Sequence, residues 1–317
     1  MSRAGYLRET ASSFVISPAE RNAIVGIKPT VGLTSRAGVV PESIHQDTVG
    51  TFGRTVRDVA YALNAIYGVD PRDNYTLAQE GKTPVGGYVQ FLTNRPALNG
   101  ATFGIPWNSF WVYADSEQQN ILLSLISLIE AAGATILNNT ELPDYQTIGA
   151  PYWNWDYAYN YANDGTEGGN SWPLGIPAFY SGLDGFLASL ELKGVMDEMY
   201  YQALSFCQRS TREDGIDAAL ANGGNPVDAL LVPPDVAQTY QIAAQAGYPM
   251  ITLPAGTHSS TGMPFGLALM GTAWSEAQLV KWASAIEDLQ LTSMTEAKRK
   301  LPNWYEYLQR NVPVLNL

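Results

Sequence analysis

The chain has two histidines, His45 and His258, and these are the first side chains to consider for acid–base chemistry. His45 lies two positions before Asp47, and with a serine these residues could form the Ser-His-Asp arrangement of a hydrolase. We favour an ordinary surface or hydrogen-bonding role for His45, because it falls in a Gly- and Pro-rich stretch typical of loops. Two histidines also argue against a histidine-based metal site, so the sequence predicts no bound metal.

Other reactive residue types form no clear constellation. Cys207 is the single cysteine, which excludes an intrachain disulfide and a cysteine-rich metal site. The glycine pairs at 86–87 and 223–224 lack the Lys and the Ser or Thr of a phosphate-binding loop. Glu287 and Asp288 are neighbours in a predicted helix and point apart, so they do not make an acid/base pair.

Composition and charge narrow the classes of partner. Hydrophobic residues make up 46% of the 317 residues and charged residues 15%, which is typical of a globular core. The formal net charge of −12 would repel phosphate backbones and anionic lipid surfaces, so we expect no nucleic-acid binding. The densest basic stretch, at 298–300, is typical of a solvated helix end. No run of about 18 apolar residues predicts a membrane span, and no signal peptide is visible, which makes the cytoplasm the default location.

The first half of the chain predicts alternating strands and helices. Residues 22–58 read as loops around a short strand at 24–27, and residues 55–67 have helical spacing with Thr55 and Asp58 as capping-box partners. A strand is expected at 101–106, then a helix capped by Asp115 and Gln118, and then a strand at 134–137. Strand, helix and strand within about 40 residues indicate the βαβ unit of a largely parallel sheet.

The second half begins with a segment that has no periodic pattern. Residues 142–184 are rich in Trp, Tyr, Asn, Gly and Pro. This composition predicts either a functional loop or a site at which part of the sequence is missing. One long helix or two are expected at 184–212, and a helix capped by Ser275 and Gln278 is expected to run to about residue 289. Three short buried strands are expected, at 229–232, 250–253 and 265–269.

Several ordered sequence blocks carry a resemblance to a known family. They are residues 21–33 (RNAIVGIKPTVGL), 35–41 (SRAGVVP), 46–50 (QDTVG), 231–234 (LVPP), 246–256 (AGYPMITLPAG) and 262–267 (GMPFGL). Taken in order, they resemble the regions downstream of the nucleophile in amidase-signature enzymes. The resemblance is to the fungal branch of that family. The resemblance implies a single α/β domain over residues 1–317, incomplete at its N-terminus, with a mixed twisted sheet flanked by helices.

The resemblance also implies a chemistry. Members of the family hydrolyse carboxylic amides with a serine nucleophile, a second serine in a cis peptide that relays the proton, and a lysine base. Backbone N–H groups of the turn before the nucleophile form the oxyanion hole. No metal or organic cofactor is implied, and the implied partner is a small amide substrate or ligand. The resemblance leaves room for a homodimer, and the eight Trp and eighteen Tyr could line a pocket for an apolar or aromatic amide.

The position that matches the nucleophile departs from the family pattern. The family reads roughly Glu-Thr-Asp/Gly-Gly-Ser and then Pro-Ala, whereas this chain reads ETASSFVISPA at 9–19. Counting forward from the Glu-Thr pair places Ser13 at the nucleophile position, and counting back from Pro18 places Phe14 there. The matching oxyanion-hole residues would be Thr10, Ala11 and Ser12. Replacement of the family's glycine by a serine could misdirect these N–H groups.

The matched part of the sequence contains no counterpart of the lysine base or of the cis-serine. We therefore expect an amidase-family carbon–nitrogen hydrolase by ancestry whose catalytic apparatus is incomplete in this chain. A non-catalytic small-molecule-binding or scaffold protein is the alternative, and a non-functional or truncated gene product is a third. Residues 1–20 are expected to be a remnant or solvated tail, with Ser12 and Ser13 in it. The aromatic segment at 153–170 looks shorter than in the family, as a deletion would make it.

Overall fold

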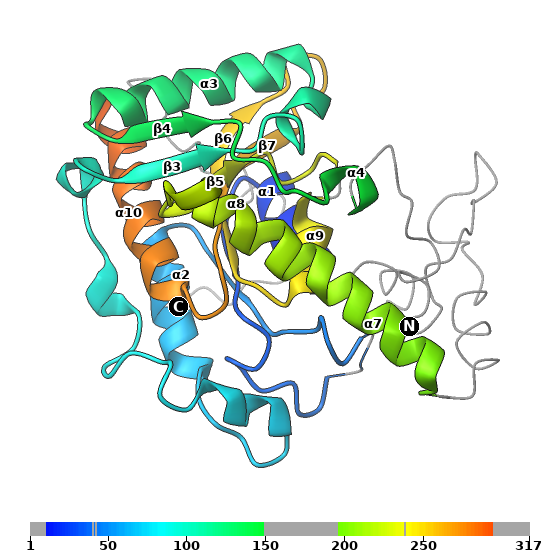
Figure 1. Cartoon of the computed structure of the whole chain (residues 1–317). Helices are drawn as coiled ribbons and strands as arrows, with labels where there is room; N and C mark the ends of the chain where they lie inside the picture. Colours follow the sequence, from blue (N-terminus) through cyan, green and yellow to red (C-terminus); the bar gives the residue numbers. More distant parts are fainter. Residues whose placement is uncertain (1–10, 40, 42, 149–195, 238, 294–317) are drawn as a thin grey trace, which may run out of the picture.

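The sheet at the centre of the molecule contains both parallel and antiparallel strands. The computed structural model describes residues 11–39, 41, 43–148, 196–237 and 239–293. Seven strands within these residues form one sheet in the order β2-β1-β6-β7-β5-β3-β4 (Figure 1). Their bounds are β1 Val25–Lys28, β2 Thr51–Gly53, β3 Thr102–Ile105, β4 Thr135–Asn138, β5 Ala229–Val232, β6 Met250–Thr257 and β7 Pro264–Met270.

Parallel pairing is confined to one end of the sheet. β3 pairs in parallel with both β4 and β5, and helix α3 (Ser116–Ala131) connects β3 to β4. This confirms the βαβ unit expected from the sequence, but the expectation of a largely parallel sheet is wrong, because four of the six strand pairings in the described part of the chain are antiparallel. β5, β7, β6, β1 and β2 are joined by antiparallel pairing. The expected mixed sheet flanked by helices is therefore confirmed.

Helices cover both faces of the sheet (Figure 1). α10 (Glu276–Ser293) packs on β6, α3 and α2 (Val56–Ile66), which defines one helical layer. α1 (Ala11–Arg21) packs on β1, β6 and α9 (Thr239–Ala246), and α9 contacts α7 (Glu198–Thr211), which defines the other. Shorter helices are α4 Tyr145–Ile148, α8 Asp217–Ala221, η2 Asn74–Gln79, η3 Val89–Phe91, η4 Arg95–Leu98, η5 Trp111–Tyr113, the π turn η7 Arg212–Ile216 and η8 Asn222–Gly224.

The three predicted N-cap residues each precede their helix, but only one of the three predicted capping boxes forms. Thr55 accepts a hydrogen bond from the backbone N–H of Asp58, and the Asp58 side chain accepts from the backbone N–H of Thr55, which confirms that capping box. The Asp115 carboxylate accepts from the N–H of Gln118 as expected, but the Gln118 side chain donates to Asp235 at 2.8 Å and does not complete the predicted capping box. Ser275 lies at the predicted N-cap of α10, which begins at Glu276, and its carbonyl accepts a hydrogen bond from the N–H of Leu279. Its hydroxyl donates to the carbonyl of Thr272 at 2.6 Å and does not form the predicted capping box with Gln278.

The expected solvated tail must be corrected for its last residues. Residues 11–21 form α1, and Ile16 and Ala19 on it are fully buried. The apolar side chains of this helix find partners on β1 and α9, so burial outweighs the lack of an acidic first turn. Residues 15–20 therefore belong to a packed helix and not to a solvated tail. Residues 1–10 and most of the unpatterned segment, at 149–184, lie outside the described residues.

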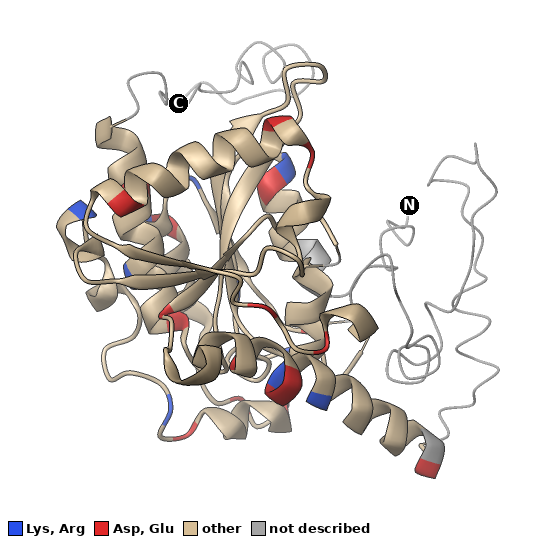
Figure 2. Ribbon diagram, turned by 45° about the horizontal axis from the view of Figure 1, so that its top comes forward, with Lys and Arg blue, Asp and Glu red and all other residues tan. Residues whose placement is uncertain are grey.

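Basic and acidic residues are interspersed over the described part of the fold. Figure 2 shows Lys and Arg scattered among acidic residues on helices and loops of the described part. None of the helices in the described ranges is long and apolar enough to cross a bilayer.

Candidate active-site region

The residues matched to the family nucleophile lie at the start of α1. Ala11, Ser12, Ser13 and Phe14 form the first turn of this helix, whereas Thr10 lies outside the described residues. N–H groups in the first turn of a helix have no partner within the helix and can receive an anion. The structure thus brings the two alternative nucleophile positions, Ser13 and Phe14, into the same helical turn.

Two glycines let α1 approach the sheet closely. A Cβ on Gly26 of β1 would lie 2.6 Å from the Cβ of Ala19, and a Cβ on Gly50 would lie 2.8 Å from Cγ2 of Val15. Both distances are too short for real atoms, so these positions require glycine. Because Val15 directly follows the first turn, its contact with Gly50 places that turn beside the loop at 46–50, which is one of the family blocks.

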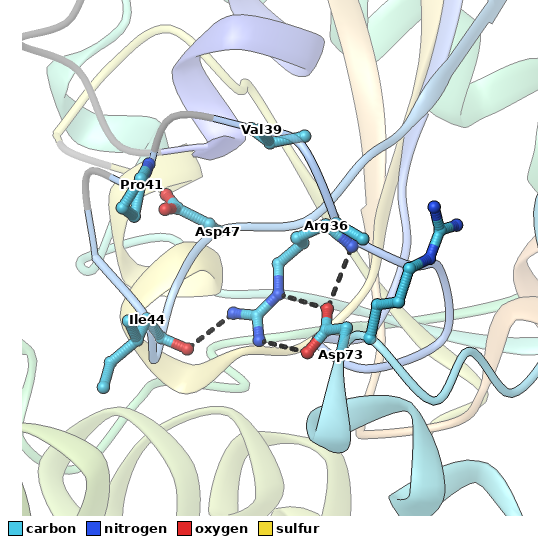
Figure 3. A pocket seen from close by; sticks show the side chains of 8 residues that line it. Arg36, Val39, Pro41, Ile44, Asp47 and Asp73 are labelled. Carbon is cyan, nitrogen blue, oxygen red and sulfur yellow. Dashed lines mark hydrogen bonds and ion pairs between the residues drawn. The ribbon is translucent and has the colours of Figure 1, made fainter.

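A small cavity opens in the same loop region. Its volume is about 180 Å³, and it is lined by Arg36, Ala37, Val39, Pro41, Ile44, Asp47, Arg72 and Asp73 (Figure 3). Pockets for drug-sized ligands hold roughly 300–1,000 Å³, so this cavity suits only a small molecule. Its wall combines apolar side chains with the mostly buried carboxylate of Asp47, which accepts a hydrogen bond from the N–H of Ser43 at 3.0 Å.

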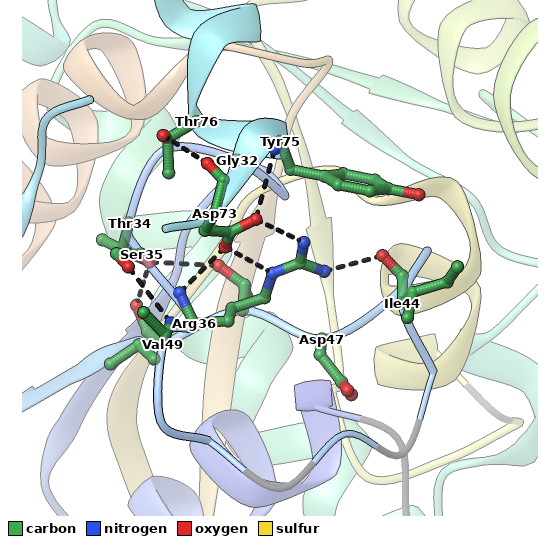
Figure 4. Close-up of polar contacts among 12 residues, drawn as sticks. Gly32, Thr34, Ser35, Arg36, Ile44, Asp47, Val49, Asp73, Tyr75 and Thr76 are labelled. Atoms are coloured by element: carbon green, nitrogen blue, oxygen red, sulfur yellow. Dashed lines mark hydrogen bonds and ion pairs between the residues drawn. The ribbon is translucent and has the colours of Figure 1, made fainter. Parts of the chain in front are cut away.

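Arg36 joins the cavity loop to η2 (Figure 4). Its Nε and Nη2 donate to the two carboxylate oxygens of Asp73 at 2.9 Å each, and its Nη1 donates to the carbonyl of Ile44 at 2.6 Å. The ring of Tyr75 lies 4.3 Å from the guanidinium carbon. Hydrogen bonds from Arg36 lower the pKa of Asp73 to about 2, so the pair stays charged over the whole physiological range.

His45 bridges two tyrosines. Its Nδ1 lies 2.9 Å from the hydroxyl of Tyr75, and its Nε2 lies 2.9 Å from the hydroxyl of Tyr200 on α7. Burial lowers the pKa of His45, and the nearby cations Arg212 and Arg36 lower it further. Both ring nitrogens are therefore used by tyrosines, which leaves none to be oriented by Asp47. The expected hydrogen-bonding role of His45 is confirmed, and the Ser-His-Asp arrangement is not formed with it.

The second histidine lies at a different place. His258 follows β6, its ring packs 4.8 Å from that of Phe265, and its Nδ1 lies 3.5 Å from a carboxylate oxygen of Asp115. The structure does not bring His258 to α1 or to the cavity loop. No group of three or more His, Cys, Asp or Glu within the described ranges is arranged to hold a metal ion.

A buried lysine was not predicted from the sequence. Lys28, at the end of β1, is fully buried, and its Nζ donates to the carbonyls of Tyr248 at 2.6 Å and Pro29 at 3.1 Å. Burial lowers its pKa to about 7, and the nearby Glu276 opposes that shift. Glu276 is also fully buried and accepts from the N–H of Thr30 at 2.6 Å. Because Nζ is directed at main-chain carbonyls inside the core, Lys28 cannot act as a base on a substrate.

Several known proteins with a similar sequence and fold are described as amidases. An amidase family profile matches residues 8–234. A Schizosaccharomyces pombe protein described as an amidase is 44% identical over 95% of this chain and 58% of its own length. An Arabidopsis thaliana protein that also bears the name amidase is 31% identical over 87% of this chain and 55% of its own length.

Solved structures agree with the sequence comparison. The peptide amidase of Stenotrophomonas maltophilia superposes with a TM-score of 0.71 at 29% identity, over 86% of this chain and 59% of that one. The chain described here therefore belongs to the amidase family, the amidase-signature enzymes. It spans only a little over half the length of the fission-yeast and plant relatives that it matches.

Proposed function

We propose that this chain provides the nucleophile-side helix and part of the substrate pocket of a carboxylic-amide hydrolase, which converts an amide to an acid and an amine or ammonia. The observation that carries the proposal is the contact of α1 with the family block at 46–50, next to a cavity sized for a small molecule. The names of the relatives support amide chemistry in general. The similarity to a peptide amidase supports a peptide amide as the first substrate to try.

We further propose that the 317 residues do not hydrolyse amides by themselves. The family reaction needs a serine nucleophile, a relaying serine and a lysine base, and only the nucleophile has a sequence match, at Ser13 or at Phe14 in the ungapped count. Lys28 does not substitute for the base, because its Nζ is held by two main-chain carbonyls. Without base and relay, a serine hydroxyl keeps its ordinary high pKa and is a weak nucleophile.

A non-catalytic binding protein is the second candidate. The cavity loop is held by the Arg36–Asp73 pair without any contribution from a lysine base or cis-serine, so a ligand site can persist where chemistry does not. The two candidates differ in one measurable property, which is the binding of a small amide. The binding protein must bind it, whereas the incomplete enzyme need not bind it. A homodimer is part of this second proposal, and light scattering would detect it.

The experiment is a hydrolysis assay with a matched variant. The purified chain and Ser13→Ala are incubated with a C-terminally amidated dipeptide and with an anilide, and release of ammonia or aniline is measured. We expect both proteins to match the buffer background, because loss of a catalytic triad costs on the order of 10⁶ in kcat. Release by the wild type that disappears in Ser13→Ala would refute incompleteness. Saturable binding of the amide by calorimetry, without release, would favour the binding protein.

A further inference from the structure

Glu20 anchors the C-terminal end of α1 on the sheet. Its side chain is 1% exposed, and its Oε1 accepts a hydrogen bond from the N–H of Gly266 on β7 at 2.8 Å. Its Cγ lies 3.6 Å from the point where a Cβ of Gly266 would stand, so it packs directly on the strand. No donor among the described residues reaches its other oxygen, Oε2. An ionised carboxylate that is buried with an unpaired oxygen is unfavourable, and protonation removes that cost.

The carboxyl group that interacts with Glu20 belongs to Asp235, in the loop between β5 and α9. The side chain of Asp235 is 11% exposed, and its Oδ2 lies 3.8 Å from Nη2 of Arg21. Its Oδ1 accepts from Nε2 of Gln118 at 2.8 Å. Asp235 thus has a donor and an ion-pair partner to stabilise its charge, whereas no donor in the described part of the chain reaches Oε2 of Glu20. Two carboxyl groups can hydrogen-bond to each other only when one of them carries a proton.

Few charged groups face Glu20. Arg21 contributes a positive charge from α1 itself, and Asp235 contributes a negative charge from the neighbouring loop. β7 presents the backbone of Gly266, β6 presents Thr252, and the only titratable side chain on α9 is Tyr240. Burial raises the pKa of Glu20 to about 8, and the charge of Asp235 raises it as well, against the lowering effects of the Gly266 N–H and Arg21.

We propose that Glu20 and Asp235 form a proton-dependent clasp, in which one shared proton between their side chains holds α1 on β7 and on the loop after β5. When the proton is lost, two negative charges adjoin at a buried position and the end of α1 loosens. The clasp acts on the helix whose first turn carries Ser12 and Ser13. It does not depend on amide hydrolysis, and it is tested without an activity assay.

The direction of the pH effect follows from the pKa of Glu20. An unfolded glutamate ionises near 4.5, whereas Glu20 in the folded chain keeps its proton to about 8. The stabilisation is therefore complete below about pH 4.5 and is lost as the pH rises through about 8. Within this window the opening equilibrium of α1 should rise by up to about tenfold per pH unit.

Hydrogen exchange followed by mass spectrometry, corrected for the intrinsic exchange rate at each pH, measures this opening for peptides that cover α1. The variants are Glu20→Gln, Asp235→Asn and, as a matched control, Glu130→Gln on the exposed side of α3. We expect corrected α1 exchange in the wild type and in Glu130→Gln to rise at least about thirtyfold between about pH 6 and 8. In Glu20→Gln it should rise less than about threefold, because the amide can donate to Asp235 at every pH.

Asp235→Asn keeps the test decisive if Glu20→Gln fails to fold. Its side-chain amide gives ionised Glu20 a donor and removes the neighbouring charge, so the rise in α1 exchange should again become small. A wild-type pH dependence that survives in either folded variant overturns the clasp. The clasp is also overturned if the pH-dependent exchange is spread evenly over β6, β7 and α10 and is not concentrated in α1.

Discussion

Arg36 illustrates how one side chain can fix a loop that has no regular secondary structure. Its guanidinium bonds to Asp73 in a two-pronged geometry and to the carbonyl of Ile44, and its own backbone N–H donates to Asp73 as well. The side chains of the two ionic partners are only 12% and 7% exposed. Asp73 also caps η2, so the loop and that short helix depend on the same carboxylate.

Removing the Arg36 side chain should therefore destabilise the fold. We expect Arg36→Ala to lower the free energy of unfolding by about 3 kcal/mol, because a nearly buried carboxylate loses its cation. Arg36→Lys should recover little of this, because an ammonium cannot make the two-pronged contact. Urea unfolding followed by circular dichroism gives both values.

Arg72 provides the matched control. It also bonds to a nearby aspartate, Asp70, but its side chain is 77% exposed, so Arg72→Ala should leave the unfolding curve unchanged within error. Equal effects of Arg36→Ala and Arg72→Ala would contradict the assignment of Arg36 as the residue that fixes the loop.

Among the secondary-structure elements, α1 depends most directly on small residues beneath it. The Cα atoms of Gly26 and Gly50 face Ala19 and Val15, and the absence of their Cβ atoms allows the helix to lie directly on β1. Its C-terminal end is held by Glu20, and its N-terminal end adjoins the cavity loop. The position of the nucleophile-matched turn is thus set by packing along the whole helix.

Moving the methyl group from Ala19 to Gly26 tests whether this packing positions α1. We expect Gly26→Ala to cost about 2–3 kcal/mol, because the new Cβ would lie 2.6 Å from that of Ala19. Ala19→Gly alone should cost about 1 kcal/mol through helix entropy. The double variant should lose less stability than the two single variants added together, since the methyl group has only changed sides. Strict additivity in urea unfolding would show that the two residues are not in contact.

At the scale of the whole molecule, we predict that adding the missing catalytic groups restores amide hydrolysis. A chimera would carry an N-terminal segment of a family member that has the lysine base and the cis-serine, joined before Val15, with Gly-Ser in place of Ser13-Phe14. We expect this protein to release ammonia from an amidated dipeptide and to lose the activity when the restored serine becomes alanine. His45→Ala in the chimera should leave kcat intact, because both nitrogens of His45 are bound to tyrosines.

The same chimera with Ser13-Phe14 retained is the control and should stay inactive. A folded chimera that is inactive even with Gly-Ser would contradict the proposal that the remaining pocket walls suffice. The segment at 142–184 would then be the part to replace next from the same relative.

Patterns that repeat along the chain were enough to predict most elements. The spacing in residues 55–67 predicted α2 with its capping box, and apolar runs predicted β3 to β7 within a few residues. These patterns are readable because a cap or a buried face involves neighbours one to four residues apart. The ordered Gly-Pro blocks gave the family for a related reason, since close approach of backbones constrains residue type locally.

Tertiary structure alone decided which distant side chains meet. Nothing in the sequence connects Lys28 with Glu276, Arg36 with Asp73, or His45 with Tyr200, because these pairs depend on how loops and helices cross after folding. Residues 11–21 were not predicted as a helix, since their stability comes from burial on β1 and α9 and not from helix caps. The sequence by itself determined the elements and the family, because these are encoded by local spacing. The helical first turn of the candidate nucleophile region and the clasp at the other end of α1 follow only from long-range packing.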